Sequence, residues 1–187
     1  SLYAVLGDPS KSGIAFSGHT DVVPTEGQAW DTNPFEMVDK NGLLYGRGTC
    51  DMKGFIAVVL AKVPDLVAAK LPIPIHFMFS YDEEVGCLGA FKLAEYLKEQ
   101  NDNIKLCIVG EPTMMKPITA HKGVCDSCCE VHGKECHSSL APYGVNAVEY
   151  AARYVAKLLE LRPTLQARAP KGSRFVPPWT TLNVGAV

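Results

Sequence analysis

Residues 73–86 have the sequence IPIHFMFSYDEEVG, which joins a strand to an unusual turn. The apolar run Ile73–Phe79 has the length and composition of a buried strand. Three consecutive carboxylates, Asp82, Glu83 and Glu84, follow where the strand leaves the core. Like charges repel, and burying them unpaired is costly. Either these residues form a solvated turn, or a cation binds beside them.

Strands and helices alternate on both sides of this stretch. Residues 87–100 are expected to form an amphipathic helix, because Ala90, Leu93, Ala94 and Leu97 follow the i, i+3, i+4, i+7 spacing. A second helix is expected to run from Asp51 to residue 70, with Pro64 kinking or ending its regular part. Strands are expected over residues 2–7, 13–21, 73–80 and 104–110, and a short strand or turn over 42–48. This alternation predicts an α/β fold with a mostly parallel sheet.

The pattern changes after residue 120. A strand pair is expected over 119–133, a helix over 144–161, a loop over 162–178 and a last strand over 180–187. We therefore expect a catalytic, metal-binding domain over 1–123 and part of a second, α+β domain over 124–187.

Composition excludes several classes of function. The 187 residues carry a net charge of −2, which leaves no basic footprint for nucleic acid or a membrane surface. Apolar runs are too short to span a bilayer, and no signal peptide is visible. The seven cysteines, without a secretory signal, indicate free thiols in a reducing cytoplasm. The first residue, Ser1, enters a strand pattern directly, so a fragment of a longer protein is expected.

Polar side chains follow several of the predicted strands. They are His19 and Asp21 in SGHTDVVP, Asp51 in GRGTCDMKG, Glu83 and Glu84 in YDEEVG, and Glu111 in IVGEPT. Ligands of open α/β sheets bind at the carboxyl ends of the strands, so these side chains are expected to meet at one rim. One imidazole with several carboxylates suits a divalent metal such as zinc, and a cation would remove the repulsion within the acidic turn.

Four motifs carry a family resemblance. SGHTDVVP, LYGRGTCDMKGF, DEEVG and VGEPT, in this order and spacing, resemble the zinc-dependent deacylase and peptidase family that contains acetylornithine deacetylase, succinyl-diaminopimelate desuccinylase and aminoacylase. GEPTMMKPITAHKG and CHSSLAPYGVNAVEY are most similar to the acetylornithine deacetylases. The resemblance covers essentially the whole chain. It implies a catalytic α/β domain with an inserted α+β lid domain through which two subunits form a homodimer.

The resemblance also implies a role for each site residue. His19 and Glu111 would bind one metal ion, and Asp51 would bridge it to a second ion held by Glu84. Glu83 would be the general base and Asp21 would orient His19. His137 of the lid domain would stabilise the oxyanion across the dimer. Both ions are expected to be zinc, with cobalt as an alternative. The second site is incomplete here, because the family's last ligand, a histidine, lies beyond residue 187.

The implied reaction is hydrolysis of an N-acyl amino acid, with N-acetylornithine in arginine biosynthesis as the first candidate. Two alternatives stay open: a related desuccinylase, aminoacylase or peptidase, and a truncated, non-catalytic metal-binding and dimerisation module. Cys50 and Cys136 stand where the family has small residues. The stretch CDSCCEVHGKECH, residues 125–137, contains C-x-x-C, but Cys125 and Cys128 would face opposite sides of a strand, so free thiols are favoured over a zinc knuckle.

Overall fold

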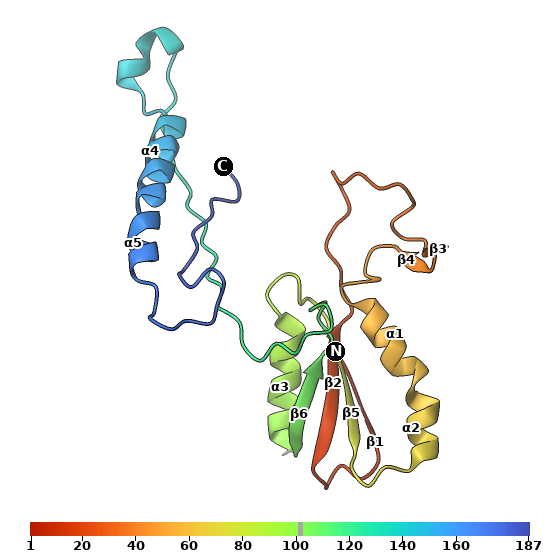
Figure 1. The fold of residues 1–187 in the computed structure, drawn as a ribbon. Coiled ribbons are helices and arrows are strands. Elements are labelled where there is room, and N and C mark those ends of the chain that lie inside the picture. Colours follow the sequence, from red (N-terminus) through yellow and green to blue (C-terminus); the bar gives the residue numbers. More distant parts are fainter. Residues whose placement is uncertain (101–102) are drawn as a thin grey trace. The chain divides into compact units, whose positions relative to one another are not determined.

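A four-stranded sheet organises the first part of the chain. In the computed structural model, which describes residues 1–100 and 103–187, the chain divides into two units, Ser1–Pro117 and Ile118–Val187. The sheet belongs to the first unit, and its strands lie in the order β1 (Leu2–Leu6), β5 (Ile75–Ser80), β2 (Gly13–His19) and β6 (Ile104–Val109) (Figure 1). The boundary between the units falls shortly before the expected one at 123/124.

Three of the four strands are parallel. Strand β2 pairs in parallel with both β5 and β6, whereas β1 pairs antiparallel with β5. His19 at the end of β2 lies opposite Ser80 at the end of β5, and Ser17 lies opposite Val109 at the end of β6. The predicted α/β fold with a mostly parallel sheet is therefore confirmed, and the carboxyl ends of these strands share one edge.

Helices cover both faces of the sheet (Figure 1). Helices α1 (Lys53–Ala61) and α2 (Val63–Ala69) lie on one face, and α3 (Leu88–Gln100) lies on the other. The break between α1 and α2 is the one predicted from Pro64, which occupies the first turn of α2, where proline is tolerated. Within the described residues, each helix is too short or too polar to cross a bilayer.

The core follows the period of two along β5. Ile75, Phe77 and Phe79 pack with Val59 of α1 on one face, and Met78 packs with Leu93 of α3 on the other. His76 lies within this strand, is fully buried, and has its Nδ1 2.7 Å from the hydroxyl of Tyr3. It is a core histidine and lies among these packed side chains.

A small hairpin precedes α1. Strand β3 (Val38–Lys40) pairs antiparallel with β4 (Leu43–Tyr45), which lies within the predicted strand or turn over 42–48. Strand β3 was not predicted, although the turn residues Asn41 and Gly42 carry the usual signal of such a hairpin. Both have positive φ angles, 55° and 75°, as the tight hairpin turn requires.

The second unit consists of helices and extended chain. It contains a 3₁₀ helix η1 (Ser138–Tyr143) and the helices α4 (Ala147–Glu160) and α5 (Arg162–Ala167). The predicted helix over 144–161 is confirmed as α4, which begins after Asn146, whose side chain accepts a hydrogen bond from the Val148 N–H. The Lys122 ammonium donates to the carbonyls of Pro177 and Trp179 and ties the two ends of the unit together.

Three predictions for the second unit are wrong. Residues 119–133 and 180–187 form no strand in the structure described, because their alternating side chains find no neighbouring strand to pair with. An isolated bridge between Lys134 and Val145 is the pairing observed nearby. The expected loop over 162–178 begins with helix α5, since Pro163 lies in its first turn and does not interrupt it.

Candidate metal centre

The predicted site residues of the first unit lie at the carboxyl edge of the sheet. His19 is the last residue of β2, Glu83 and Glu84 follow β5, and Glu111 follows β6. Asp51 lies just before α1, one residue ahead of the fully buried Met52. Strand ends and one helix start thus deliver an imidazole and four carboxylates to one region.

A first group of ligand atoms surrounds the tip of the imidazole. The candidate ligand atoms of His19, Asp51 and Glu111 all lie within 4.8 Å of one another. His19 Nε2 is 2.9 Å from Asp51 Oδ1 and 4.0 Å from Glu111 Oε1. His19 is buried, whereas the side chains of Asp51 and Glu111 are 49% and 39% exposed, so the group opens to solvent on its carboxylate side.

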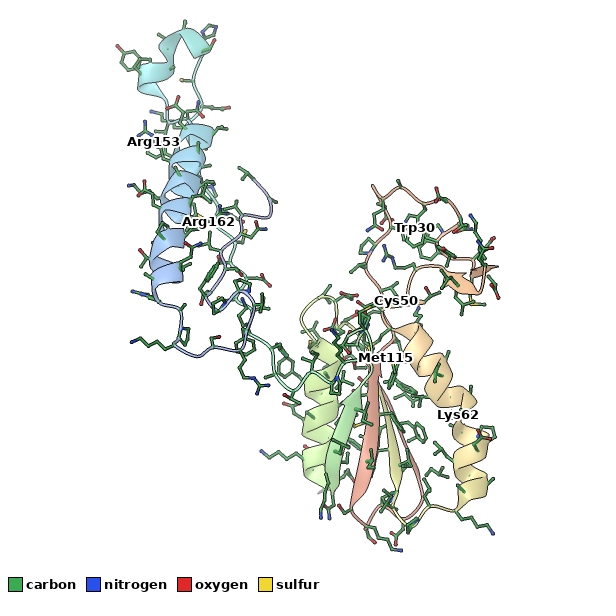
Figure 2. All side chains as sticks on the ribbon, viewed as in Figure 1. Trp30, Cys50, Lys62, Met115, Arg153 and Arg162 are labelled. Carbon is green, nitrogen blue, oxygen red and sulfur yellow. The ribbon has the colours of Figure 1, made fainter. Side chains whose placement is uncertain are left out.

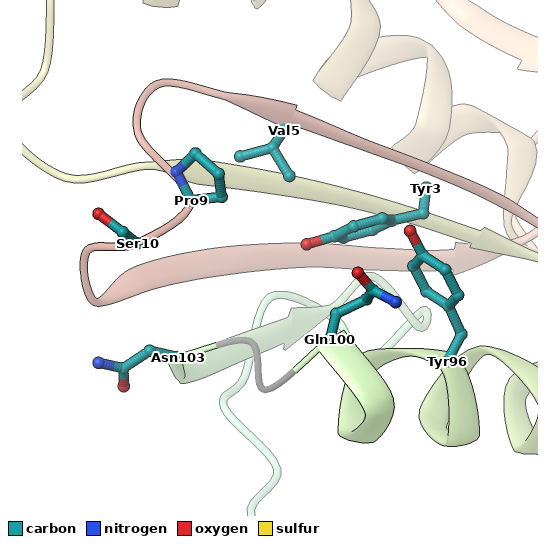
Figure 3. A pocket seen from close by; sticks show the side chains of 7 residues that line it. All are labelled: Tyr3, Val5, Pro9, Ser10, Tyr96, Gln100 and Asn103. Atoms are coloured by element: carbon teal, nitrogen blue, oxygen red, sulfur yellow. The ribbon is translucent and has the colours of Figure 1, made fainter.

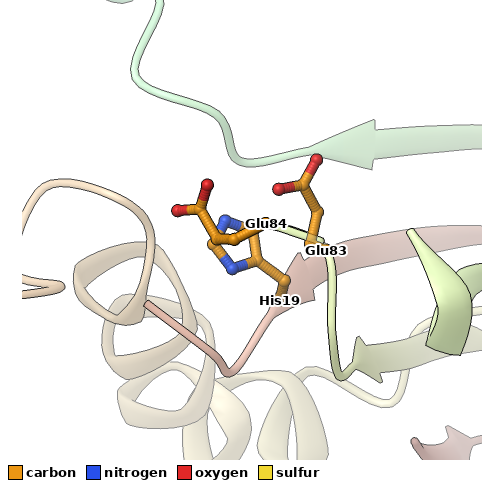
Figure 4. A group of neighbouring side chains, drawn as sticks. All are labelled: His19, Glu83 and Glu84. Atoms are coloured by element: carbon orange, nitrogen blue, oxygen red, sulfur yellow. The ribbon is translucent and has the colours of Figure 1, made fainter. Parts of the chain in front are cut away.

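A second group uses the same histidine. The ligand atoms of His19, Glu83 and Glu84 also lie within 4.8 Å of one another. Figure 4 shows both glutamates on the loop after β5, with their side chains near the imidazole of His19. Two adjacent glutamates are therefore available at this group, and they can serve two different roles.

Asp21 holds the imidazole from behind and also contacts the acidic turn. Its backbone carbonyl is 3.0 Å from His19 Nδ1, and its carboxylate Oδ1 is 3.5 Å from the same nitrogen. A proton on Nδ1, donated to the Asp21 carbonyl, would leave Nε2 free to ligate a metal ion in place of its hydrogen bond to Asp51, the arrangement of a metal-ligating histidine. Asp21 Oδ2 accepts a hydrogen bond from the Glu84 N–H at 3.0 Å. Burial would raise the pKa of Asp21, but backbone N–H donors including that of Glu84 hold the pKa below its ordinary value.

The cluster is electrostatically crowded. Burial and the negative charges of Asp51 and Glu83 raise the pKa of Glu84, and burial together with Asp51 raises the pKa of Glu111. Burial works to lower the pKa of His19, but the hydrogen bond to Asp51 and the nearby carboxylates outweigh it, so the pKa is raised. Each shift has the sign expected where negative charge is in excess.

These residues fit a divalent metal ion. Two overlapping groups each combine one imidazole nitrogen with two carboxylate oxygens, which is a donor set for zinc or a similar cation. Burial and excess negative charge together raise the pKa values of Glu84 and Glu111, and a cation would offset that charge. Glu83 and Glu84 of the acidic turn that follows β5 are thus part of the cluster.

Tight packing fixes the elements that carry the ligands. Gly110 precedes Glu111 and lies against the ring of Phe55, so that an added Cβ would overlap the ring. Gly18 precedes His19, and a Cβ there would lie 3.0 Å from the Met52 Cε. The sequence analysis did not identify these two glycines. Their position, directly ahead of a predicted ligand at the end of a strand, was the available signal.

The remaining predicted residue and the cysteines lie outside these groups. His137 belongs to the second unit, where its Nδ1 accepts a hydrogen bond from the Ser139 N–H, which places a proton of the neutral ring on Nε2. Cys50 lies exposed just before α1 (Figure 2) and is absent from both ligand groups found among the described residues. The seven cysteines, all within the described part of the chain, are free thiols.

A cavity of about 700 Å³ lies at the other end of the sheet. Tyr3, Tyr96 and Gln100 line it together with residues that precede β2 and β6 (Figure 3). Since β2 runs from this end toward His19, the cavity lies at the amino ends of the parallel strands. It contains none of the candidate ligands, so the chemistry belongs to the carboxyl edge.

Comparison with known proteins identifies the family. Residues 15–175 match the sequence model of Peptidase family M20/M25/M40. The chain belongs to this family. The match includes His19, Asp51, Glu83, Glu84 and Glu111, and it confirms the resemblance drawn from the four motifs.

Solved structures of this M20 family resemble the chain over part of its length. Human carnosine dipeptidase 1 is 31% identical with a TM-score of 0.49, covering 57% of this chain and 24% of its own. The metallo-carboxypeptidase Sso-CP2 of Sulfolobus solfataricus is 23% identical with a TM-score of 0.50, covering 58% and 25%. The di-peptidase Dug1p of Saccharomyces cerevisiae is 31% identical with a TM-score of 0.46, covering 57% and 24%.

The chain spans about a quarter of the length of these structures. Sso-CP2 supports the α/β fold described above. M20 family members are metallo-hydrolases, and the chain contains candidate ligands for a divalent metal in the expected place.

Proposed function

We propose that the protein is a metal-dependent amide hydrolase that removes the acyl group from an N-acyl amino acid, with N-acetylornithine as the first candidate substrate. The observation that carries this proposal is the convergence of His19, Asp51, Glu84 and Glu111 beside a further carboxylate, Glu83. Hydrolysis of an amide by water needs a general base, and Glu83 is a carboxylate available for that role in addition to those that would hold metal.

In this proposal His19, Asp51 and Glu111 hold one ion, and Glu84 with Asp51 contributes to a second. A divalent metal bound there would polarise the amide carbonyl and make a water molecule more acidic. Asp21 keeps the proton on His19 Nδ1, so that Nε2 remains available as a ligand. The carboxylate ligands offset the charge of the cation.

Glu83 performs the proton transfers in this proposal. Its carboxylate removes a proton from the attacking water, whose oxygen forms the new bond to the amide carbon. Glu83 then gives this proton to the amide nitrogen as the carbon–nitrogen bond breaks. The products are the free amine of the amino acid and the carboxylate of the acyl group.

The second unit supplies the remaining part of the proposal. The Nε2–H of His137 would donate to the oxygen that becomes negative when water adds. We place His137 on the partner subunit of a homodimer formed through residues 124–187, in a cytoplasmic protein. Exposed apolar side chains on α4, Val148, Tyr150 and Tyr154, support an interface on this unit.

A hydrolysis assay on the full-length protein tests the proposal. Zinc-loaded protein is incubated with N-acetylornithine, an N-succinylated diaminopimelate and an unmodified dipeptide, and the released amine is measured. Glu83→Gln preserves the shape of the side chain but cannot accept the proton, so turnover should fall by at least about 100-fold with KM little changed. Glu26→Gln is the control, because Glu26 is exposed and belongs to neither ligand group.

Each outcome decides between the readings of the sequence. Hydrolysis of N-acetylornithine that depends on Glu83 supports the proposal as stated. Preference for the succinylated substrate or the dipeptide would show that N-acetylornithine is not the substrate, while the proposed mechanism of amide hydrolysis would stand. Metal-loaded, folded protein that hydrolyses none of the three would favour a non-catalytic metal-binding module.

A further inference from the structure

Cys87 lies next to the glutamate that we propose as the general base. Its Sγ is 3.5 Å from Glu83 Oε1, within the range of an S–H···O hydrogen bond. Cys87 is half-buried and immediately precedes α3. It has no place among the candidate metal ligands of the described residues, so another explanation is needed for a thiol at this position.

Cys87 contacts both the backbone and the side chain of Glu83. The Cys87 N–H donates to the Glu83 carbonyl at 3.0 Å, and the thiol donates to the Glu83 carboxylate. The turn around this pair is closed by further backbone bonds, from Leu88 N to Asp82 O and from Gly89 N to Tyr81 O. Because the backbone of the turn is already fixed, the thiol bond acts on the direction of the carboxylate.

We propose that Cys87 is a positioning residue that fixes the direction of the Glu83 carboxylate, so that this side chain acts as the base. This inference rests on the proposed function, since it assigns a role to the neighbour of the general base. Glu83 and Glu84 are adjacent and both lie within ligand distance of His19. The thiol donor on the Glu83 carboxylate distinguishes this side chain from Glu84 and restricts the directions that the base can take.

The thiol is suited to this role. Burial and the bond to Glu83 raise the pKa of Cys87, so the sulfur keeps its proton and remains a donor. The backbone of Cys87 has a φ of 59°, in the left-handed region that favours glycine. A cysteine at a position where glycine would be conformationally easier indicates that the side chain contributes something that glycine does not.

Three substitutions separate the thiol from the backbone. Cys87→Ala removes the donor, Cys87→Gly removes it and relieves the left-handed conformation, and Cys87→Ser keeps a donor on a shorter bond. For each full-length variant, kcat, KM, bound zinc and thermal unfolding are measured with the best substrate found for the wild type. We expect kcat to fall about tenfold in the alanine and glycine variants, with KM and bound zinc unchanged, because the base is misdirected while binding is preserved.

The serine variant should retain kcat within about threefold of wild type, since a hydroxyl can replace the donor. Wild-type kcat in Cys87→Gly, or in all three variants, would overturn the inference, and so would loss of zinc in parallel with activity. A wild-type protein with no hydrolytic activity would refute the proposed function instead, and the inference would fall with it. The two failures are thereby distinguishable.

Discussion

Replacing Glu84 by glutamine should change the stability of the protein in opposite directions with and without metal. Burial raises the pKa of the Glu84 carboxylate, and the nearby charges of Asp51 and Glu83 raise it further. Glutamine has nearly the same shape but no charge, and the backbone bond from Glu84 N to Asp21 is kept. Without metal the substitution removes repulsion; with metal it removes a ligand.

The size of the effect follows from the geometry. Candidate ligand oxygens of Glu83 and Glu84 lie within 4.8 Å of each other. At that separation two unit charges interact by about 1 kcal/mol in a water-like dielectric, the appropriate choice for side chains in contact with solvent. The metal-free variant should therefore be about 1 kcal/mol more stable, which corresponds to a rise in Tm of about 2–4 °C for a protein of this size.

With saturating zinc the order should reverse. Loss of one ligand that weakens zinc binding about 10- to 100-fold removes about 1.4–2.7 kcal/mol of ligand-linked stability. Thermal unfolding of wild type and variant is recorded in a chelator and in excess zinc, with Glu26→Gln as the matched control. A variant that is destabilised in the chelator would show that the carboxylates are satisfied structural groups, and the reasoning from repulsion would be refuted.

Three further results are expected. In a chelator, the free energy of unfolding should rise as pH falls from 8 through the ordinary His pKa of 6.5 toward the ordinary Glu pKa of 4.5. The reason is that His19 and Glu84 have raised pKa values in the folded state and therefore gain protons more readily when folded. Thermal unfolding in excess zinc should show the reverse trend, since protons compete with the metal. Gly110→Ala should cost about 1–3 kcal/mol of stability and weaken zinc binding, because the added methyl group would overlap the ring of Phe55. The control is Gly185→Ala, which has open space around it and should leave denaturant unfolding and zinc titration unchanged. Asp21→Asn should weaken zinc binding about 10- to 100-fold by titration calorimetry, since it removes the charge that supports the ligating histidine, and unchanged affinity would contradict that role.

The sequence predicted the first unit well because its elements are defined locally. Strand β5 is a continuous apolar run, helix α3 carries regular hydrophobic periodicity, and Pro64 marks the break between α1 and α2. The position of β1 beside β5, and its antiparallel direction, depend on pairing between distant segments and could not be predicted from local pattern. The unpaired stretches of the second unit failed for the same reason, since alternation alone does not supply a partner strand.

The candidate site likewise contains features that the sequence predicted and one that it did not. The polar residues after β2, β5 and β6 were predicted to meet because parallel strands end at one edge, and the structure brings them together. The contact between Cys87 and Glu83 was not predicted. It depends on a turn in which Asp82 and Cys87 both have positive φ angles, 51° and 59°. Such angles are uncommon for residues other than glycine, so the sequence does not indicate this turn.

The central claim is that the acidic turn after β5 and its partners bind a divalent metal ion. The most direct measurement is the zinc content per chain of purified protein after dialysis against zinc and removal of excess, compared with Asp51→Ala. The account predicts a zinc content of about one or more per wild-type chain and its loss in the variant, since the Asp51 carboxylate lies in contact with the His19 ligand nitrogen. A folded wild-type chain that retains no zinc, or a variant that retains as much as wild type, would contradict it.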